Sequence, residues 1–425
     1  MDRPQGSFAG MFSSAIVTQA LLSAANLLVS LILIRRATDA EYGYFVLIVN
    51  SLLLLTSLQG AFMQPPMVIR ITRLDAQGRA ALIGGLAYAQ RRLLWMLALL
   101  SAGLVTIGVL TTAVPAPLLL ILSAALAAAI VALFREFFRM VLLAYRRPTD
   151  VLKADFLYVV ILVSGVYAAT YTKLPAVIAT LMLAIAAAGG SWLLARALQA
   201  HEPWQSRHMP GILRSIAPMG AWSAGGAVTH WAFSQGYNYV AVGALDVTAV
   251  AALAATRLTM MPINLMSAGI GSLMMPTASA WLKQHGAAAV LQRLLRVAGA
   301  LAVATVVYFA ALWTLQDWIF NGIMGKDFAF REELLMAWAA VFFVAVFRDQ
   351  LLYLPGASGR FRALAIITLG SALISLTLTY IGLETIGVIG APLGVLAGEL
   401  VNLAGIIALS LREIRNERMA TAVAT

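Results

Sequence analysis

The sequence predicts an all-α, polytopic membrane protein with twelve transmembrane helices in two six-helix lobes. Of the 425 residues, 61% are hydrophobic and 11% are charged, whereas soluble domains are about 45–50% apolar and about 25% charged. A helix needs roughly 20 apolar residues to cross a bilayer. Apolar stretches of that length recur along the whole chain and end at charged, Gly, Pro, Asn or Asp clusters.

Twelve such stretches follow one another. They are residues 12–34, 44–67, 93–113, 116–134, 154–172, 176–195, 215–243, 247–275, 297–319, 334–354, 363–383 and 386–411. The first is too long for the core of a signal peptide and is expected to be an uncleaved helix. Gly, His, Asn and Arg interrupt the seventh and eighth, and Pro262 is expected to bend the eighth.

The middle of the chain predicts the division into lobes. Residues 201–212 are polar and contain Pro and Gly. We therefore expect an N-terminal lobe at 1–200, a cytoplasmic linker at 201–212 and a C-terminal lobe at 213–425. The halves also echo one another, because Asp39 and Asp246 are 207 residues apart and Pro66 and Pro276 are 210 apart. Parallel repeats of this kind occur in transporters.

Positive charge predicts the orientation. With a cytoplasmic N-terminus, 23 of the 29 Lys and Arg residues are assigned to the inside, counting Arg348 at the cytoplasmic end of the tenth span, and 5 to the outside, while Arg257 alone is assigned to the interior of a span. Because cytoplasmic loops carry the excess of Lys and Arg, we expect both termini in the cytoplasm. The formal charge of +11 then reflects topology and attraction to membrane lipids, and no soluble domain remains to bind nucleic acid.

Several chemistries are not expected. There is no cysteine, and the four histidines have no metal-ligand spacing. No GxxxxGK[ST], GxSxG or HExxH motif occurs, and no outside loop exceeds about 13 residues. We therefore expect no enzyme, no catalytic residue, no metal and no cofactor.

Polar side chains form stripes at helical spacing on the first two helices of each half. They are Gln19, Ser23, Asn26 and Ser30; Asn50, Ser57 and Gln64; Ser223, His230, Ser234 and Tyr237; and Asp246, Arg257 and Asn264. The stripes suggest a shared hydrated cavity between the lobes. The alternative is that these residues hydrogen-bond between helices, at about 0.6 kcal/mol each.

Arg257 is the sharpest single residue, since a cation near the bilayer centre usually marks a pathway or pairs with an acid. One interpretation is an anion clamp, because guanidinium grips phosphate bidentately. The other is a structural pair with Glu399, or with Asp246 through a partner helix. On its own helix Asp246 lies about 16 Å away and cannot touch Arg257.

Glu399 and Asp246 are the candidate ion-coupling residues. A buried carboxylate such as Glu399 can carry a proton or can bond a neighbouring helix. His230 is a hydrogen-bonded cavity residue or a proton switch. Two groups also keep two interpretations each. One group is aromatic and is expected to stack on sugars or to form an interfacial belt: Trp222, Trp231, Phe233, Tyr237 and Tyr239. The other group is charged and is expected to act as cytoplasmic anchors or gates: Arg135, Glu136, Arg139, Arg348 and Asp349.

Two stretches, TQALLSAANLLVSLILIRRATDAEYGYFVLIVNSLLLL and HWAFSQGYNYVAVGALDVTAVAALAATRLTMMP, resemble the polysaccharide-exporter (Wzx-type) branch of the multidrug/oligosaccharidyl-lipid/polysaccharide (MOP) superfamily. The resemblance implies a MATE/MOP-like, V-shaped transporter of the bacterial inner membrane whose first, second, seventh and eighth helices line the cavity. It implies that an undecaprenyl-diphosphate-linked oligosaccharide is flipped by alternating access, with Arg257 on the diphosphate. The expected cavity residues are Arg257, His230, Asn264, Tyr237, Asn26, Gln19, Asn50 and Gln64.

The expected partners are the lipid-linked glycan, membrane lipids, and a polysaccharide polymerase and glycosyltransferases. An alternative is a multidrug or organic-cation exporter of the same superfamily, which should carry acidic residues in the first two spans, and these spans contain none. A more distant alternative is a non-transporting scaffold of a polysaccharide synthesis complex, for which the polar stripes are unnecessary.

Overall fold

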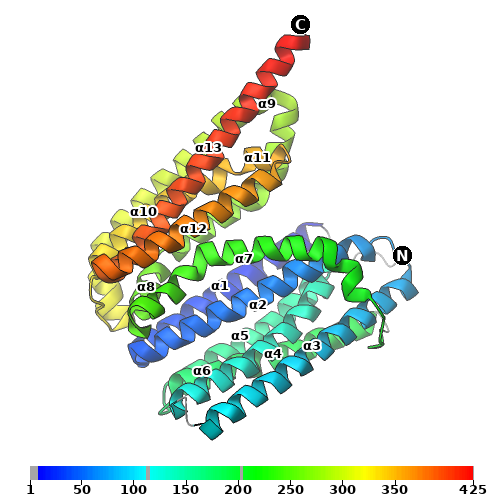
Figure 1. The fold of residues 1–425 in the computed structure, drawn as a ribbon, viewed down its shortest axis with the longest axis vertical. Coiled ribbons are helices and arrows are strands. Elements are labelled where there is room, and N and C mark those ends of the chain that lie inside the picture. Colours follow the sequence, from blue (N-terminus) through cyan, green and yellow to red (C-terminus); the bar gives the residue numbers. More distant parts are fainter. Residues whose placement is uncertain (1–7, 112–114, 202–203, 425) are drawn as a thin grey trace. The chain divides into compact units, whose positions relative to one another are not determined.

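Helices build the whole described chain. The computed structural model describes residues 8–111, 115–201 and 204–424, and within these ranges there is no strand (Figure 1). The chain divides into two compact units, Met1–Val228 and Thr229–Thr425, called here unit 1 and unit 2. The boundary lies within α7 (Ile212–Ala244), C-terminal to the segment 201–212 that the sequence analysis interprets as a linker. The all-α expectation is confirmed.

Unit 1 contains six helices and the start of α7. The six are α1 (Phe8–Arg36), α2 (Asp39–Ile71), α3 (Ala76–Thr111), α4 (Ala116–Ala144), α5 (Pro148–Ala169) and α6 (Pro175–His201). Two of them extend well beyond the apolar stretches that predicted them. Helix α3 begins at Ala76 rather than at residue 93, and α4 continues past residue 134 to Ala144. Charged residues end an apolar stretch, but they do not end a helix, because Arg and Glu are good helix formers.

Unit 2 contains the rest of α7 and the elements after it. They are α8 (Val247–Leu258), α9 (Met261–Asp317), the π-helix η1 (Trp318–Met324), α10 (Arg331–Leu351), α11 (Tyr353–Ala357), α12 (Phe361–Ile386), the 3-10 turn η2 (Gly387–Ile389) and α13 (Gly390–Ala424). Helix α9 is interrupted at Gly286, whose φ of 77° is left-handed. Glycine adopts this conformation without the steric cost of a Cβ, so α9 consists of two helical segments.

Nine helical stretches of the described chain are long and apolar enough to cross a membrane, or ten if the bent pair Val247–Leu258 and Met261–Gly271 counts as one span. One of the nine, Phe361–Met419, contains both α12 and α13. These two helices are antiparallel, because a Cβ on Gly382 would meet Gly390, and a Cβ on Gly394 would meet Thr379. In their described residues the twelve predicted spans are largely helical, with residues 112 and 113 of the third lying outside the described part, and the chain is a multi-pass membrane protein.

The eighth predicted span is broken rather than straight. Helix α8 ends at Leu258, α9 begins at Met261, and the two axes are bent by 56°. Pro262 lies in the first turn of α9, where its missing N–H removes no helical hydrogen bond. The hydroxyl of Tyr308 donates to the carbonyl of Thr259 at 2.5 Å, so one carbonyl at the break is satisfied. The expected stripe of Asp246, Arg257 and Asn264 therefore does not follow one continuous helix.

The core of unit 1 joins helices α2 to α7. Met67, Ile83, Leu86, Phe137 and Leu142 are each at most 1% exposed and belong to one apolar cluster. The start of α7 packs closely on α2, since a Cβ on Gly220 would lie 2.4 Å from the carbonyl oxygen of Phe62. Arg70 of α2 also donates to the hydroxyl and the carbonyl of Ser215, at 2.9 and 2.8 Å. The first part of α7 is thus fixed to unit 1.

Candidate functional site

Arg257 is held in unit 2 by neutral groups. Its Nη1 donates to Oε1 of Gln235 and to the hydroxyl of Tyr237, both at 3.2 Å. Its guanidinium carbon lies 5.5 Å from the ring centre of Tyr237 and 5.6 Å from that of Trp338. Those two rings meet edge to face at 5.3 Å, and both are almost fully buried. Two aromatic faces and an amide therefore fix the guanidinium.

The charge of Arg257 is not cancelled by an ion pair. No carboxylate of the described residues lies within ion-pair distance of it, so neither Asp246 nor Glu399 is its direct partner. Only Nη1 makes hydrogen bonds to the described protein, whereas guanidinium has five N–H donors. The side chain is half-buried, so the remaining donors can bind an anion.

A second charged group lies at the end of α10. Arg348 forms ion pairs with Oε1 of Glu399 through Nη2 and with Oδ1 of Asp349 through Nε, each at 3.2 Å. Its guanidinium carbon is 5.8 Å from the ring centre of Phe233, and Ser267 donates to Asp349 at 3.1 Å. These contacts join α7, α9, α10 and α13. The group contains two carboxylates and one cation, and we call Arg348, Asp349 and Glu399 the unit 2 triad.

The triad and Arg257 are neighbours within unit 2. The carboxylate of Glu399 is within electrostatic range of Arg257 as well as of Arg348, and His230 is within range of Arg348 and Asp349. Oε2 of Glu399 and both side-chain polar atoms of the buried Gln350 have no hydrogen-bond partner. Because buried polar atoms are normally satisfied, this part of unit 2 can bind ions, water or a polar ligand.

Asp246 caps a helix. Its Oδ1 accepts from the N–H groups of Thr248 and Ala249, at 2.8 and 2.9 Å, and from the Thr248 hydroxyl at 2.6 Å. The hydrogen bond from the Thr248 hydroxyl, followed by those from the backbone, lowers the pKa of Asp246. The residue is exposed at the start of α8, and its part in ion coupling stays a prediction.

The other expected cavity residues lie in different surroundings. In unit 1, Gln19 and Asn26 of α1 and Gln64 of α2 are exposed, whereas Asn50 of α2 is buried. In unit 2, His230 and Asn264 are exposed and Tyr237 is buried against Arg257. The structure brings Arg257 and Tyr237 together, pairs Glu399 with Arg348 in the triad, and places His230 near the triad. A cavity shared by the two units stays a prediction.

The expected aromatic cluster on α7 divides. Trp222 is 71% exposed, whereas Phe233 and Tyr237 are buried. Trp231 and Tyr239 pack on one another with ring centres 5.2 Å apart. Phe233 lies against Arg348 and Tyr237 against Arg257, so these two aromatic side chains position cations in unit 2.

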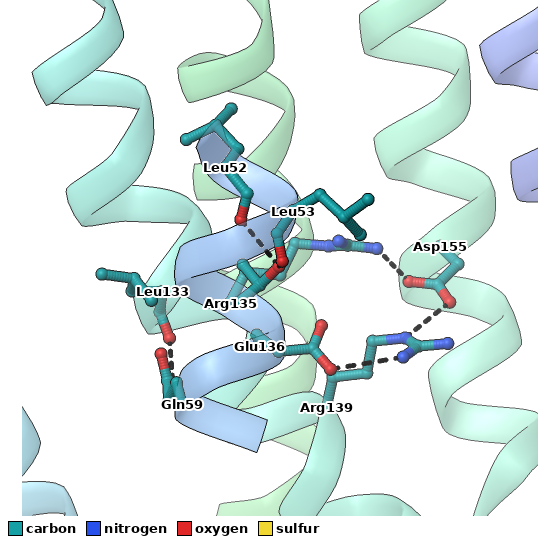
Figure 2. A network of polar contacts seen from close by, with 9 residues as sticks. Leu52, Leu53, Gln59, Leu133, Arg135, Glu136, Arg139 and Asp155 are labelled. Carbon is teal, nitrogen blue, oxygen red and sulfur yellow. Dashed lines mark hydrogen bonds and ion pairs between the residues drawn. The ribbon is translucent and has the colours of Figure 1, made fainter. Parts of the chain in front are cut away.

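Unit 1 contains a buried charge network that sequence reasoning saw only in part. Asp155 of α5 is fully buried, and its two oxygens pair with Nη2 of Arg135 and, at 3.2 Å, with Nε of Arg139 (Figure 2). Glu136 pairs with Arg139 at 3.4 Å, and the Arg135 guanidinium carbon lies 4.0 Å from the ring centre of Tyr158. The unit 1 network, Arg135, Glu136, Arg139 and Asp155, therefore has two charges of each sign.

Asp155 and Gln235 are the functional neighbours that the sequence analysis missed. One signal was available, because Phe134-Arg135-Glu136 and Phe347-Arg348-Asp349 repeat the same pattern at corresponding places in the fourth and tenth spans. That repeat marks the arginines but not their partners, which come from other helices.

Comparisons with known proteins identify the fold. No family model matches the chain, and no curated protein matches its sequence. Solved structures do match over nearly the full length. An inward-facing multidrug resistance MATE family transporter of the MOP superfamily has a TM-score of 0.74 at 16% identity, covering 94% of this chain and 96% of its own.

Two further structures agree. An outward-facing multidrug resistance MATE family transporter of the MOP superfamily has a TM-score of 0.63 at 13% identity, covering 97% of this chain and 95% of its own. A MOP superfamily transporter from Pyrococcus furiosus has a TM-score of 0.63 at 14% identity, covering 94% and 93%. This protein has the fold of MATE transporters of the MOP superfamily.

Proposed function

We propose that this protein is a transporter that carries an undecaprenyl-diphosphate-linked oligosaccharide across the bacterial inner membrane by alternating access. The observation that carries the proposal is the environment of Arg257. A cation within a transmembrane segment is costly and usually marks a pathway or a paired acid. Arg257 is held by Gln235, Tyr237 and Trp338 rather than by a carboxylate, so its charge is available to a substrate.

The chemistry of Arg257 suits a diphosphate. Guanidinium cannot lose its proton and grips phosphate oxygens bidentately. With Nη1 committed to Gln235 and Tyr237, the N–H groups on Nη2 and Nε remain for two phosphate oxygens. The polar residues expected in the cavity would contact the sugars while the lipid tail stays in the bilayer.

The unit 2 triad supplies a coupling element. Glu399 and Asp349 place two carboxyl groups around one arginine. A proton or cation taken up by Glu399 balances the triad, and its release restores the excess charge. In this proposal an ion gradient drives transport and both termini lie in the cytoplasm. A polysaccharide polymerase and glycosyltransferases would be functional partners.

Export of organic cations is the second candidate, and the same triad favours it. A net negative group in unit 2 would attract a cationic drug, and the first two structural relatives are multidrug resistance transporters. For the Pyrococcus furiosus structure, the reverse polarity of the binding pocket is described as suggesting a different function. The sign of the charge that contacts the substrate therefore distinguishes an exporter of an anionic lipid-linked glycan from an exporter of cationic drugs.

Complementation of a strain that lacks its own lipid-linked oligosaccharide flippase tests the proposal. The wild-type protein should restore surface glycan and clear the accumulated undecaprenyl-linked precursor. Arg257→Ala should abolish both effects, and Arg257→Lys should restore little, because an ammonium group cannot grip bidentately. Drug susceptibility of the same strains measures the second candidate.

Arg293→Ala is the matched control. The Arg293 guanidinium carbon also lies over an aromatic ring, 5.1 Å from the centre of Trp281, but outside the charged part of unit 2. Its removal should leave surface glycan unchanged. Full complementation by Arg257→Ala at wild-type expression would overturn the role of Arg257, and drug resistance without glycan export would favour the second candidate.

A further inference from the structure

A groove lies on unit 1 between α3 and α4, away from the charged residues discussed above. Its volume is about 310 Å³, at the lower end for ligand pockets. Leu94, Trp95 and Ala98 line it from α3, and Ile130, Val131 and Phe134 line it from α4. The remaining lining residue is Arg91. The walls are apolar, and one cation is present.

The cation lies at one end of the groove. Residues 91, 94, 95 and 98 share one face of α3, so Arg91 is about two turns from Ala98. Its guanidinium carbon is 6.0 Å from the ring centre of Tyr88, on the side of Arg91 away from the groove. Among the residues that the structure describes, no carboxylate forms an ion pair with Arg91. The groove is therefore amphipathic along its length.

The groove is open on one side, and on the other it is bounded by the packed core of unit 1. Trp95 is 65% exposed, whereas Leu94 is buried. Phe134 packs edge to face on Phe138, with ring centres 4.9 Å apart, and Phe138 belongs to the buried core of unit 1. The floor is thus part of the core, and the open side is an exposed apolar face of two helices that are long and apolar enough to cross a membrane.

We propose that this groove is a binding site for an anionic glycerophospholipid, with an acyl chain between α3 and α4 and its phosphate on Arg91. Charge complementarity selects the occupant. The positive-charge bias places Arg91 at the cytoplasmic side, where anionic lipids are concentrated and each nearby cation contributes about 1 kcal/mol. The apolar walls accept a hydrocarbon chain and offer no polar partner to a sugar or peptide.

Photocrosslinking on the full chain in nanodiscs tests the site. The probes are phosphatidylglycerol and phosphatidylcholine carrying the same diazirine acyl chain, and labelled peptides are mapped by mass spectrometry. Phosphatidylglycerol should label residues 94–98 and 130–134 about fivefold more than phosphatidylcholine, as one interacting cation implies. Arg91→Ala should remove this preference, and Ala98→Trp should prevent labelling by both probes.

Two controls match the variants. Arg92 is exposed beside Arg91, and Ala102 is exposed one turn beyond Ala98, but neither lines the groove. Arg92→Ala and Ala102→Trp should leave the labelling unchanged, and thermal unfolding confirms that each variant is folded. Equal labelling by the two lipids, preferential labelling by a polyprenyl phosphate probe, or crosslinks to a second copy of the chain at this groove would overturn the proposal.

Discussion

The same three-residue pattern, Phe-Arg-acid, is surrounded differently in the two units. In unit 1, Arg135 and Arg139 share the fully buried Asp155, and Glu136 completes a network of two cations and two anions. In unit 2, Arg348 is the one arginine of the described residues that forms ion pairs with Asp349 and Glu399. The difference lies in the partner helices, α5 in one unit and α13 in the other.

The comparison separates a structural network from a group that can change its charge. A balanced, buried network gains nothing by taking up or releasing a proton, since either change leaves an unpaired charge. The unit 2 triad has two carboxyl groups and one arginine, so a proton on one carboxyl group leaves the other paired with Arg348. We therefore expect substitutions in unit 1 to affect stability and substitutions in unit 2 to affect coupling.

Asp155→Asn gives the largest expected effect. It removes the fully buried carboxylate that the half-buried Arg135 and Arg139 share, and breaking a buried pair costs about 3–5 kcal/mol. The measurement is thermal unfolding of the purified protein in detergent. Asp150→Asn on the same helix removes a partly exposed pair with Arg147 and should cost less than about 1 kcal/mol. Similar melting temperatures for the two variants would show that the unit 1 network is not structural.

Gly398→Ala is expected to cost about 1–3 kcal/mol through overpacking. Its Cβ would lie 2.5 Å from Cβ of Ser375 and 3.0 Å from the Ser371 carbonyl oxygen, beside Glu399. Gly190→Ala in unit 1 should cost less, because its nearest contact is the Arg135 side chain at 3.1 Å.

Unfolding midpoints of these variants measure how tightly packing holds each charged group. Gly370→Ala on α12 is the control, since nothing lies within 4 Å of its Cβ; it should be neutral or slightly stabilising. A Gly190→Ala variant less stable than Gly398→Ala would show that packing is tighter beside the unit 1 network than beside the unit 2 triad, contrary to this prediction.

Glu399→Gln should change stability by only about 1 kcal/mol, because Arg348 keeps Asp349 and the amide can still accept a hydrogen bond. Transport should lose its dependence on the proton gradient, since the amide cannot titrate. Uptake of substrate into proteoliposomes, compared with and without a pH gradient, measures the transport rate and its dependence on the proton gradient. Glu384→Gln, at an exposed position of α12, is the control, and retained stimulation by the gradient in Glu399→Gln would rule out proton coupling at this residue.

The helices were predictable from the sequence, and the pairings between them were not. Apolar length located all twelve helical segments because the bilayer sets it, and Pro262 signalled the bend near the break at Met260. The start of α3 was not found, because Gln, Arg and Gly residues interrupt the apolar run between residues 76 and 92, although the segment is helical and its apolar residues are partly buried. Within the site, Arg257 was identifiable as a costly intramembrane cation. Its partner Gln235 was not, since the contact depends on how α7 packs on α8.

Removing a helix cap is expected to have the smallest effect on the free energy of unfolding. The caps compared are those of α2 in unit 1 and α8 in unit 2. Thr38 caps α2 through a hydroxyl and a capping box with Glu41, whereas Asp246 caps α8 through a carboxylate. Asp246→Ala should cost about 0.5–1 kcal/mol, toward the lower part of the range for lost caps because the site is exposed. Asp246→Asn should cost less, since asparagine also caps.

The two caps should also differ in their response to pH. The capping hydrogen bonds, that from the Thr248 hydroxyl first, lower the pKa of Asp246 below its ordinary value. The stabilisation is therefore fully present above that ordinary value and is lost as the pH falls through the lowered one. Unfolding midpoints of the wild type and Asp246→Asn should converge as the solution becomes acidic, because only the aspartate cap is lost. A difference between them that does not vary with pH would show that Asp246 does not act as a titrating cap, and the two halves would then begin their second helices in the same way.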